Sequence, residues 1–218
     1  MGDNARDSNN NSARAVTRRA QLVKAAITVF SRVGFHEATV RQITDTAGVS
    51  AGLAYQYVAD KHDLLFLALR HIVETNRREI PSAIGSSPDA LLRLIRAIEA
   101  YTHVIAANRE AVLLTYRETK SLRPDDVESI KKMELDTNAL IAACVEECVA
   151  AGFLASHHTE LLVFRIITAA HAWALKNWRL RAIVSLEEYI EQSIHACWRP
   201  LLTAKGRKRQ RQLLEGAH

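Results

Sequence analysis

The stretch from Thr39 to Lys61, TVRQITDTAGVSAGLAYQYVADK, decides the fold. It contains two short helical patterns that meet at residues 47–50, Ala-Gly-Val-Ser. Gly48 can adopt the left-handed backbone conformation that a tight turn between helices requires, and Ser50 carries a side-chain oxygen that can cap the second helix. Two helices joined in this way cross steeply, and the second fits the major groove of DNA. The stretch therefore predicts a helix-turn-helix DNA-binding domain.

Helical patterns continue on both sides of this stretch. An apolar stripe with helical spacing begins near Thr17 and ends at Gly34. Downstream, Pro81 is expected to stop the next helix and Gly152 to end a later one. The expected helices after the turn cover 61–80, 88–107, 109–122, 124–151, 159–181 and 186–204. The chain is therefore predicted to be all-α, with about nine helices and no convincing strand.

The overall charge does not carry the DNA-binding argument. The net charge is +5, but residues 199–218 contain six lysines and arginines and one glutamate, so residues 1–198 sum to zero. The segment KGRKRQR at 205–211 could add salt-dependent affinity for DNA or could be a solvated terminus. The evidence for DNA binding is therefore the local pattern at 39–61 rather than the pI.

The remaining composition excludes several classes of protein. Three cysteines give no disulfide framework, no secretory signal is visible, and no apolar run is long enough to span a bilayer. No nucleophile elbow, Gly-rich phosphate loop or metal-ligand motif is present. We therefore expect a cytoplasmic protein that is not an enzyme, needs no cofactor and does not bind a membrane.

The spacing of constrained residues resembles the TetR family of bacterial transcriptional regulators over about residues 17–67. The resemblance rests on Ala25, Ala26, Phe30, Gly34, Phe35, Thr39, Ile43, Ala47, Gly48, Val49, Ser50, Gly52, Tyr55, Tyr57, Lys61, Leu64 and Leu65. Ala54 stands where a larger apolar residue is common in the family, and Val58 where Phe is common. Both positions are expected to pack inward, so they affect local packing rather than DNA binding.

Ten residues are candidates for DNA contact. Gln56 can pair with an adenine edge, Ala51 and Leu53 can contact a thymine methyl, and Arg41 can reach a guanine or a phosphate. The leading surface of the second helix also includes Ser50 and Gly52, and Gly52 permits close approach of the backbone. The residues placed to hold phosphates are Thr39, Tyr55, Tyr57 and Lys61.

The resemblance also implies the organisation of the chain. A disordered arm is expected at 1–13, the DNA-binding domain at 14–66, a ligand-binding and dimerisation domain at 67–204 and a basic mobile tail at 205–218. In this family the last two helices form a dimer, which suits a palindromic operator. The faces expected at that seam comprise Leu162, Ile166, Ala169, Ala170, Trp173 and Asn177, with Tyr189, Ile190, Ser193, Ile194, Cys197 and Leu201. The alternative is that both faces complete the core of one subunit.

The effector is expected to be a small hydrophobic molecule. Candidate contacts are the polar and aromatic residues within apolar helices: Tyr101, His103, Tyr116, Arg117, His171, Trp173 and Trp178. A looser resemblance, through Tyr116-Arg117-Glu118, Leu122, Gly152-Phe153, Trp173 and Asn177-Trp178, is to TetR-family regulators of fatty-acid and acyl-CoA catabolism. It implies an acyl-CoA effector whose phosphates could meet Arg77, Arg78, Arg117 or Arg165. The implied protein is a ligand-responsive regulator, most simply a homodimeric repressor.

One alternative uses the thiols. Cys144 and Cys148 are four residues apart, hence on one helical face, and His157 and His158 follow. This spacing allows a metal- or thiol-responsive regulator. Thiols on an alanine-rich helix also behave as small buried hydrophobic groups, which is the structural reading of the same residues.

Overall fold

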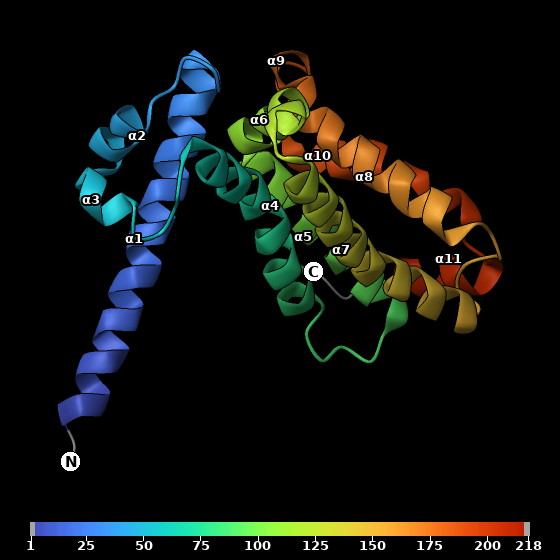
Figure 1. Cartoon of the computed structure of the whole chain (residues 1–218). Coiled ribbons are helices and arrows are strands. Elements are labelled where there is room, and N and C mark those ends of the chain that lie inside the picture. The colour runs from blue at the N-terminus through green and yellow to red at the C-terminus, as the bar shows by residue number, and fades with distance from the viewer. Residues whose placement is uncertain (1–2, 216–218) are drawn as a thin grey trace. The chain divides into compact units, whose positions relative to one another are not determined.

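The structure, a computed structural model, describes residues 3–215, with side chains from Ala15 onward. The described chain is helical throughout and forms no β-strand; an isolated β-bridge joins Leu154 and Leu202. Eleven α-helices follow one another along the described chain (Figure 1). None of these helices is long and apolar enough to cross a bilayer. The predicted all-α fold is confirmed.

The chain divides into two compact units. The first comprises residues 1–71 and a separate stretch, 113–128. It contains α1 (Asp3–Val33), α2 (Val40–Ala47), α3 (Ala51–Ala54) and the start of α4 (Lys61–Ile84). The separate stretch supplies the end of α6 (Arg109–Glu118), the 3₁₀ turn η1 (Thr119–Ser121) and the start of α7 (Pro124–Ala150). We call residues 113–128 the inserted segment.

The core of the first unit follows the predicted apolar stripe. The side chains that close it are fully or almost fully buried: Leu22, Ala26, Val29, Phe30, Phe35, Ile43, Leu64 and Leu65. Helix α1 packs against α2. Burial of each large apolar side chain contributes roughly 1.5–3 kcal/mol, so α1 serves as the platform on which the two short helices are held.

The second unit comprises residues 72–112 and the chain from 129 onward. Its centre is the packing of α5 (Ala90–Ala107) against α8 (Thr159–Leu175). After α9 (Asn177–Leu180) and α10 (Leu186–Tyr189), the chain continues as a π-helical turn, Ile190–Ile194, and two 3₁₀ turns, His195–Cys197 and Arg199–Leu201. The single helix expected over 186–204 is therefore irregular.

The faces predicted to form a dimer seam lie mostly inside this unit. Ile166, Ala170 and Ile194 are fully buried within one chain, and Leu162, Trp173, Tyr189 and Ile190 are at most 7% exposed. These side chains therefore belong to the core of a single subunit, which is the alternative interpretation given above. A different stripe of α8 remains exposed: Leu161, Phe164 and Leu175.

Three element boundaries differ from the prediction. Helix α1 begins at Asp3 rather than near Thr17, so residues 3–13 are helical where a disordered arm was expected. Helix α4 continues through Pro81 to Ile84. A proline in the last turn removes one hydrogen-bond donor, but its own carbonyl still accepts from the amide of Gly85 at 3.1 Å.

The third difference concerns the C-terminus, where a mobile tail was expected at 205–218. Residues 204–215 form α11 (Ala204–Glu215), which packs against α5. Arg209 pairs with Asp89 at 2.6 Å, and Lys205 donates to the carbonyl of Ala151 at 2.8 Å. These contacts anchor a helix whose apolar content is too low to predict packing from the sequence.

Candidate nucleic-acid interface

The first helix of the pair begins with a reciprocal cap. The Thr39 hydroxyl accepts from the amide of Gln42 at 3.2 Å, and the Gln42 side chain accepts from the amide of Thr39 at 2.9 Å. Two amide groups that a helix start leaves unpaired are thus satisfied together. Thr39 therefore caps α2 through its hydroxyl, and its side chain is exposed to solvent.

The turn between α2 and α3 has the geometry predicted from its residues. Gly48 has φ 66° and ψ 34°, the left-handed conformation. The amide of Val49 donates back to the carbonyl of Thr44 at 3.1 Å, which closes the end of α2. The Ser50 hydroxyl then accepts from the amide of Leu53 at 3.2 Å and caps α3. The turn therefore sets both the end of one helix and the start of the next.

Helix α3 presents a small, exposed surface. It covers Ala51–Ala54 and is followed by a tight turn over 55–57. Ala51, Gly52 and Gln56 are exposed and Leu53 is half-buried. Apart from the neighbouring residues and the backbone of α3 itself, nothing lies within 4 Å of the place that a Cβ on Gly52 would occupy. The surface can therefore approach a ligand closely.

The two positions that depart from the family pattern pack inward, as expected. Ala54 is fully buried and Val58 is 4% exposed. Their small side chains thus alter the interior beneath α3 and leave its outer surface unchanged.

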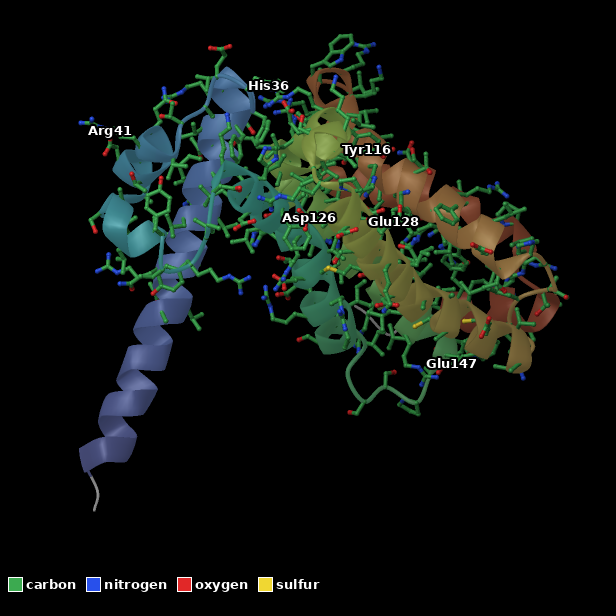
Figure 2. The ribbon with its side chains drawn as sticks, viewed as in Figure 1. His36, Arg41, Tyr116, Asp126, Glu128 and Glu147 are labelled. Carbon is green, nitrogen blue, oxygen red and sulfur yellow. The ribbon has the colours of Figure 1, made fainter. Side chains whose placement is uncertain are left out.

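The candidate phosphate contacts differ in how free they are. The Arg41 side chain, labelled in Figure 2, is 90% exposed, and it pairs with the carboxylate of Asp45 at 3.9 Å. Tyr55 is 56% exposed and Tyr57 is half-buried. The ammonium of Lys61 donates to the carbonyl of His36 at 3.0 Å and lies 4.7 Å from the centre of the Phe35 ring. Lys61 therefore also ties the start of α4 to the loop after α1.

The inserted segment is a part of this unit that sequence reasoning missed. Arg117 donates to the carbonyl of Phe30 at 2.6 Å and to the carboxylate of Glu118 at 2.9 Å. The Phe30 carbonyl also accepts from the amide of Gly34 at 2.9 Å, and a cation at the C-terminal end of a helix is favourable. Burial would raise the pKa of Glu118, but hydrogen bonds from Arg117, Ser121 and the Phe35 amide hold it below its usual value. The segment is thus fixed to the end of α1.

The effector candidates are divided between the two units. Tyr116 and Arg117 belong to the inserted segment, and Tyr116 is 57% exposed. Trp178, on α9, is 73% exposed, and His103 is exposed beside Glu187 at 3.9 Å. The remaining three, Tyr101, His171 and Trp173, lie in the interior of the second unit.

Tyr101 and His171 form a polar pair between α5 and α8. The Tyr101 hydroxyl lies 2.7 Å from Nε2 of His171, and the two rings stack at 5.9 Å. Burial lowers the pKa of His171 to about 4, so the ring is neutral at neutral pH. Trp173 contacts the ring of Tyr189 at 5.2 Å. Tyr189, whose hydroxyl donates to the carbonyl of Ala169 at 2.7 Å, was not among the candidates.

Cys144 and Cys148 are buried thiols that are held in the protonated form. Burial raises the pKa of Cys144 to about 11 and that of Cys148 to about 12, whereas the thiolate is the metal ligand and nucleophile. The Cys148 thiol lies 3.2 Å from the carbonyl of Ala90. Within the described residues, no three His, Cys, Asp or Glu side chains gather as they would around a metal ion. These observations favour the structural interpretation of both cysteines.

The first unit therefore has the architecture of a helix-turn-helix protein. A capped helix, a glycine turn and a second capped helix rest on a long first helix. This defines a DNA-binding protein that carries a second, larger helical unit.

Comparison with known proteins identifies the family. Residues 22–68 match the model for bacterial regulatory proteins of the tetR family, and residues 87–178 match that for the tetracyclin repressor-like C-terminal domain. The chain is 43% identical, over 190 residues, to the HTH-type transcriptional regulator HbdR of Aromatoleum sp. (strain CIB), covering 87% of this chain and 83% of that protein. The chain belongs to the TetR family of transcriptional regulators.

Solved structures share the fold. A tetR-family regulatory protein from Rhodococcus RHA1 superposes with a TM-score of 0.74 at 21% identity, covering 86% of this chain and 98% of that one. The fatty acid degradation regulator FadR from Bacillus halodurans superposes with a TM-score of 0.70 at 19% identity, covering 83% and 94%. At these identities the comparison establishes the architecture only.

Proposed function

We propose that this protein is a homodimeric repressor that binds a palindromic operator and releases it when a small hydrophobic effector binds. The observation that carries the proposal is the exposed surface of α3, held by caps at Thr39 and Ser50 and by the Gly48 turn. Such a short helix reads few bases, so useful specificity requires two copies.

The roles proposed for individual residues follow from their exposure. Gln56 and Arg41 extend from the surface and read base edges, while Ala51, Gly52 and Leu53 make close apolar contact. Ser50 at the helix start, with Thr39, Tyr55 and Tyr57, holds phosphates. Lys61 adds a positive charge beside these groups and fixes α4 against the loop after α1.

A two-fold interface is best placed on the exposed stripe of α8. Leu161 is 60% exposed, Phe164 43% and Leu175 37%. They recur at helical spacing on one face, which is typical of a helix that packs against a partner helix. A second copy of the chain covers this stripe in the proposed dimer.

The effector is proposed to bind in the second unit, near the Tyr101–His171 pair. An apolar interior with a few polar groups is what a small hydrophobic ligand requires. An acyl-CoA fits this chemistry, with the exposed Arg77, Arg78 or Arg165 available for its phosphates.

Helix α4 is the element through which the effector acts. It begins in the DNA-binding unit and continues into the second unit beyond His71. An equilibrium of one helix that both sites bias couples them. Effector binding therefore changes the spacing of the two α3 helices and lowers affinity for the operator.

DNA reading is tested with a duplex selected by the native protein from a random pool. Gln56→Ala should weaken binding to that duplex by about 1–3 kcal/mol and leave binding to a mixed-sequence duplex nearly unchanged. Fluorescence anisotropy measures both affinities. If Gln56→Ala leaves the selected duplex equally tightly bound, Gln56 does not read bases.

The effector class is tested separately by thermal shift and calorimetry with acyl-CoAs of different chain lengths and with aromatic acyl groups. A bound acyl-CoA should raise the melting temperature and displace the selected duplex. The absence of any shift across this series would eliminate the acyl-CoA proposal while leaving DNA reading intact.

A further inference from the structure

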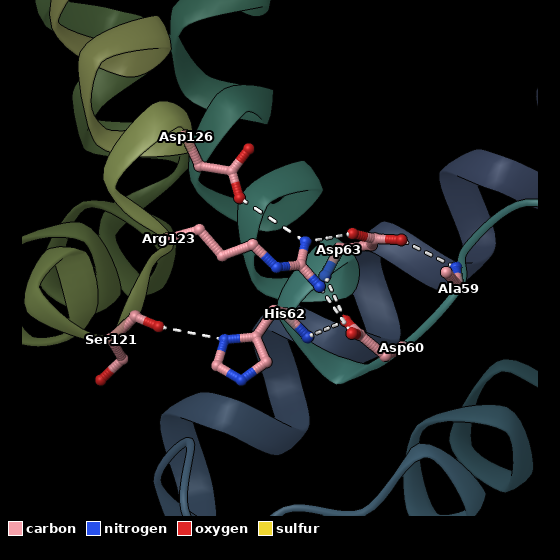
Figure 3. A network of polar contacts seen from close by, with 7 residues as sticks. All are labelled: Ala59, Asp60, His62, Asp63, Ser121, Arg123 and Asp126. Carbon is pink, nitrogen blue, oxygen red and sulfur yellow. Dashed lines mark hydrogen bonds and ion pairs between the residues drawn. The ribbon is translucent and has the colours of Figure 1, made fainter.

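The start of α4 carries two carboxylates that are held by one arginine of the inserted segment (Figure 3). Arg123 donates to Asp60 at 2.5 Å and to Asp63 at 2.6 Å, through different nitrogens of its guanidinium. These residues are about sixty positions apart in the sequence, and all three belong to the DNA-binding unit. A second link is close by, where Nδ1 of His62 lies 3.2 Å from the carbonyl of Ser121.

Both carboxylates are needed to begin α4. Asp60 accepts from the amides of His62 and Asp63 at 2.7 and 3.1 Å, and Asp63 accepts from the amide of Ala59 at 2.7 Å. This is a capping arrangement, and it explains why acidic residues stand there. Each carboxylate uses one oxygen to cap the helix. Its other oxygen is the one that Arg123 binds, and capping alone does not require that partner.

The cap has an electrostatic consequence for DNA binding. Asp60 and Asp63 flank Lys61, which we have proposed as part of the phosphate-facing surface. Without Arg123, the first turn of α4 would carry two negative charges and one positive charge, and it would repel a phosphate. Arg123, with Lys61, balances the charges of Asp60 and Asp63. The same guanidinium also pairs at 3.8 Å with a third carboxylate, on Asp126 of the inserted segment.

The ionisation of these groups agrees with this charge count. The hydrogen bond from Arg123, with that from the Ala59 amide, lowers the pKa of Asp63. Burial would raise the pKa of Asp60, but the Asp63 and His62 amides and Arg123 together hold it below its usual value. Both carboxylates are therefore charged at neutral pH and require compensation.

We propose that Arg123 is a positioning residue for DNA affinity, which it supports without touching DNA by neutralising Asp60 and Asp63 beside the phosphate-facing Lys61. Because Arg123 is supplied by the inserted segment, DNA affinity depends on that segment staying docked. The inference rests on the proposed function and adds a requirement to it: an intact α2–α3 pair binds DNA weakly when Arg123 is withdrawn.

The test compares charge compensation with simple mechanical support. Arg123→Gln should weaken binding to the selected duplex and to a mixed-sequence duplex alike, roughly threefold per DNA-binding unit at about 0.1 M salt, and the loss should shrink as salt screens the carboxylates. Arg123→Lys should retain most of the affinity. Arg96→Gln, which removes an exposed arginine of α5 in the other unit, is the matched control and should bind as the native chain does.

The decisive variant combines Arg123→Gln with Asp63→Asn. Asn retains the oxygen that caps Ala59 but removes one negative charge, so the double variant should regain affinity for both duplexes. Native affinity in Arg123→Gln, or no recovery in the double variant, would overturn the proposal; in the second case the arginine gives only mechanical support. A native chain that binds no duplex would instead refute the proposed function itself.

Discussion

At Gly52 we expect side-chain size to affect DNA binding and folding in opposite ways. Apart from its chain neighbours and its own helix backbone, a Cβ at this position meets nothing within 4 Å in the free protein, and alanine favours a helix over glycine by up to about 1 kcal/mol. Gly52→Ala should therefore leave the melting temperature unchanged or raise it. If DNA approaches the backbone here, the same variant should bind the selected duplex more weakly, by about 1 kcal/mol or more.

Thermal melting and anisotropy on one preparation separate these two effects. Ala51→Ser is a suitable control because it changes an exposed neighbour without adding bulk at Gly52. Equal affinity of Gly52→Ala and the native chain would place the DNA backbone elsewhere.

His171 predicts how stability depends on pH. Its folded-state pKa of about 4 lies below the ordinary value of 6.5. The unfolded chain therefore binds a proton that the folded chain does not, and the free energy of unfolding falls as the pH drops from about 6.5 towards 4. The full loss is about 3 kcal/mol, from the size of this pKa difference.

Urea unfolding between pH 7 and 4.5 measures this dependence. His171→Gln should flatten it by one proton. The same slope in the variant and the native protein would mean that His171 is not kept neutral in the folded state.

At the level of elements, the sequence was sufficient wherever a backbone group needs a particular residue. Gly48 and Ser50 were assigned as turn and cap, and the structure has them in those positions. Such assignments depend on local chemistry only. The irregular helical segment after α10 could not be predicted, because its π-helical and 3₁₀ turns have the same apolar spacing as a regular helix.

Helix α11 could not be predicted for a different reason, because a close tertiary contact selects it. A Cβ on Gly206 would lie 2.1 Å from the carbonyl oxygen of Phe153 and 2.8 Å from Leu202. Only glycine lets the helix reach the chain that follows α7. Charge runs such as 205–211 are usually solvated, so the sequence favoured a tail.

Gly206→Ala should therefore destabilise the second unit by about 1–3 kcal/mol, as other insertions into close-packed sites do. Differential scanning calorimetry would detect the lower transition temperature. Gly52→Ala is the matched control, since it adds the same methyl group at an open site. A Gly206→Ala variant as stable as the native chain would mean that α11 does not dock as described.

At the scale of the whole molecule, the proposed dimer makes a strong prediction. Phe164→Glu places a charge in the exposed stripe of α8 and should convert the protein to a monomer by light scattering. Loss of the second α3 should then weaken binding to a palindromic duplex by at least about a hundredfold. Leu135→Glu, at an equally apolar and 52% exposed site on α7, should remain dimeric.

If the Phe164→Glu variant has the same mass in solution as the native protein, the interface does not lie on this stripe of α8. The sequence predicted a dimer seam that includes Ile166 and Ala170, but these side chains are buried within one subunit, so the proposed interface uses another face of α8. The apolar pattern of one helix shows which residues are apolar. It does not show which of two apolar faces packs into the core of its own subunit and which is left for a partner.

The inserted segment was also beyond the reach of sequence reasoning. Arg117 and Arg123 contact residues between about sixty and ninety positions earlier, and no local pattern reports such a pairing. As a result, the DNA-binding domain was predicted as one continuous stretch, whereas the compact unit also contains residues 113–128.

Three helices, α4, α6 and α7, each start in one unit and finish in the other. This bears on how such regulators can be recombined, in evolution or in the laboratory. A hybrid protein with a single crossover point after α4 would take its DNA-binding helices from one parent and α6 and α7 from the other. Asp60 and Asp63 would then face the other parent's residue at the position of Arg123. The exchangeable module is therefore discontinuous, and functional hybrids should be those that inherit residues 1–71 and 113–128 from the same parent.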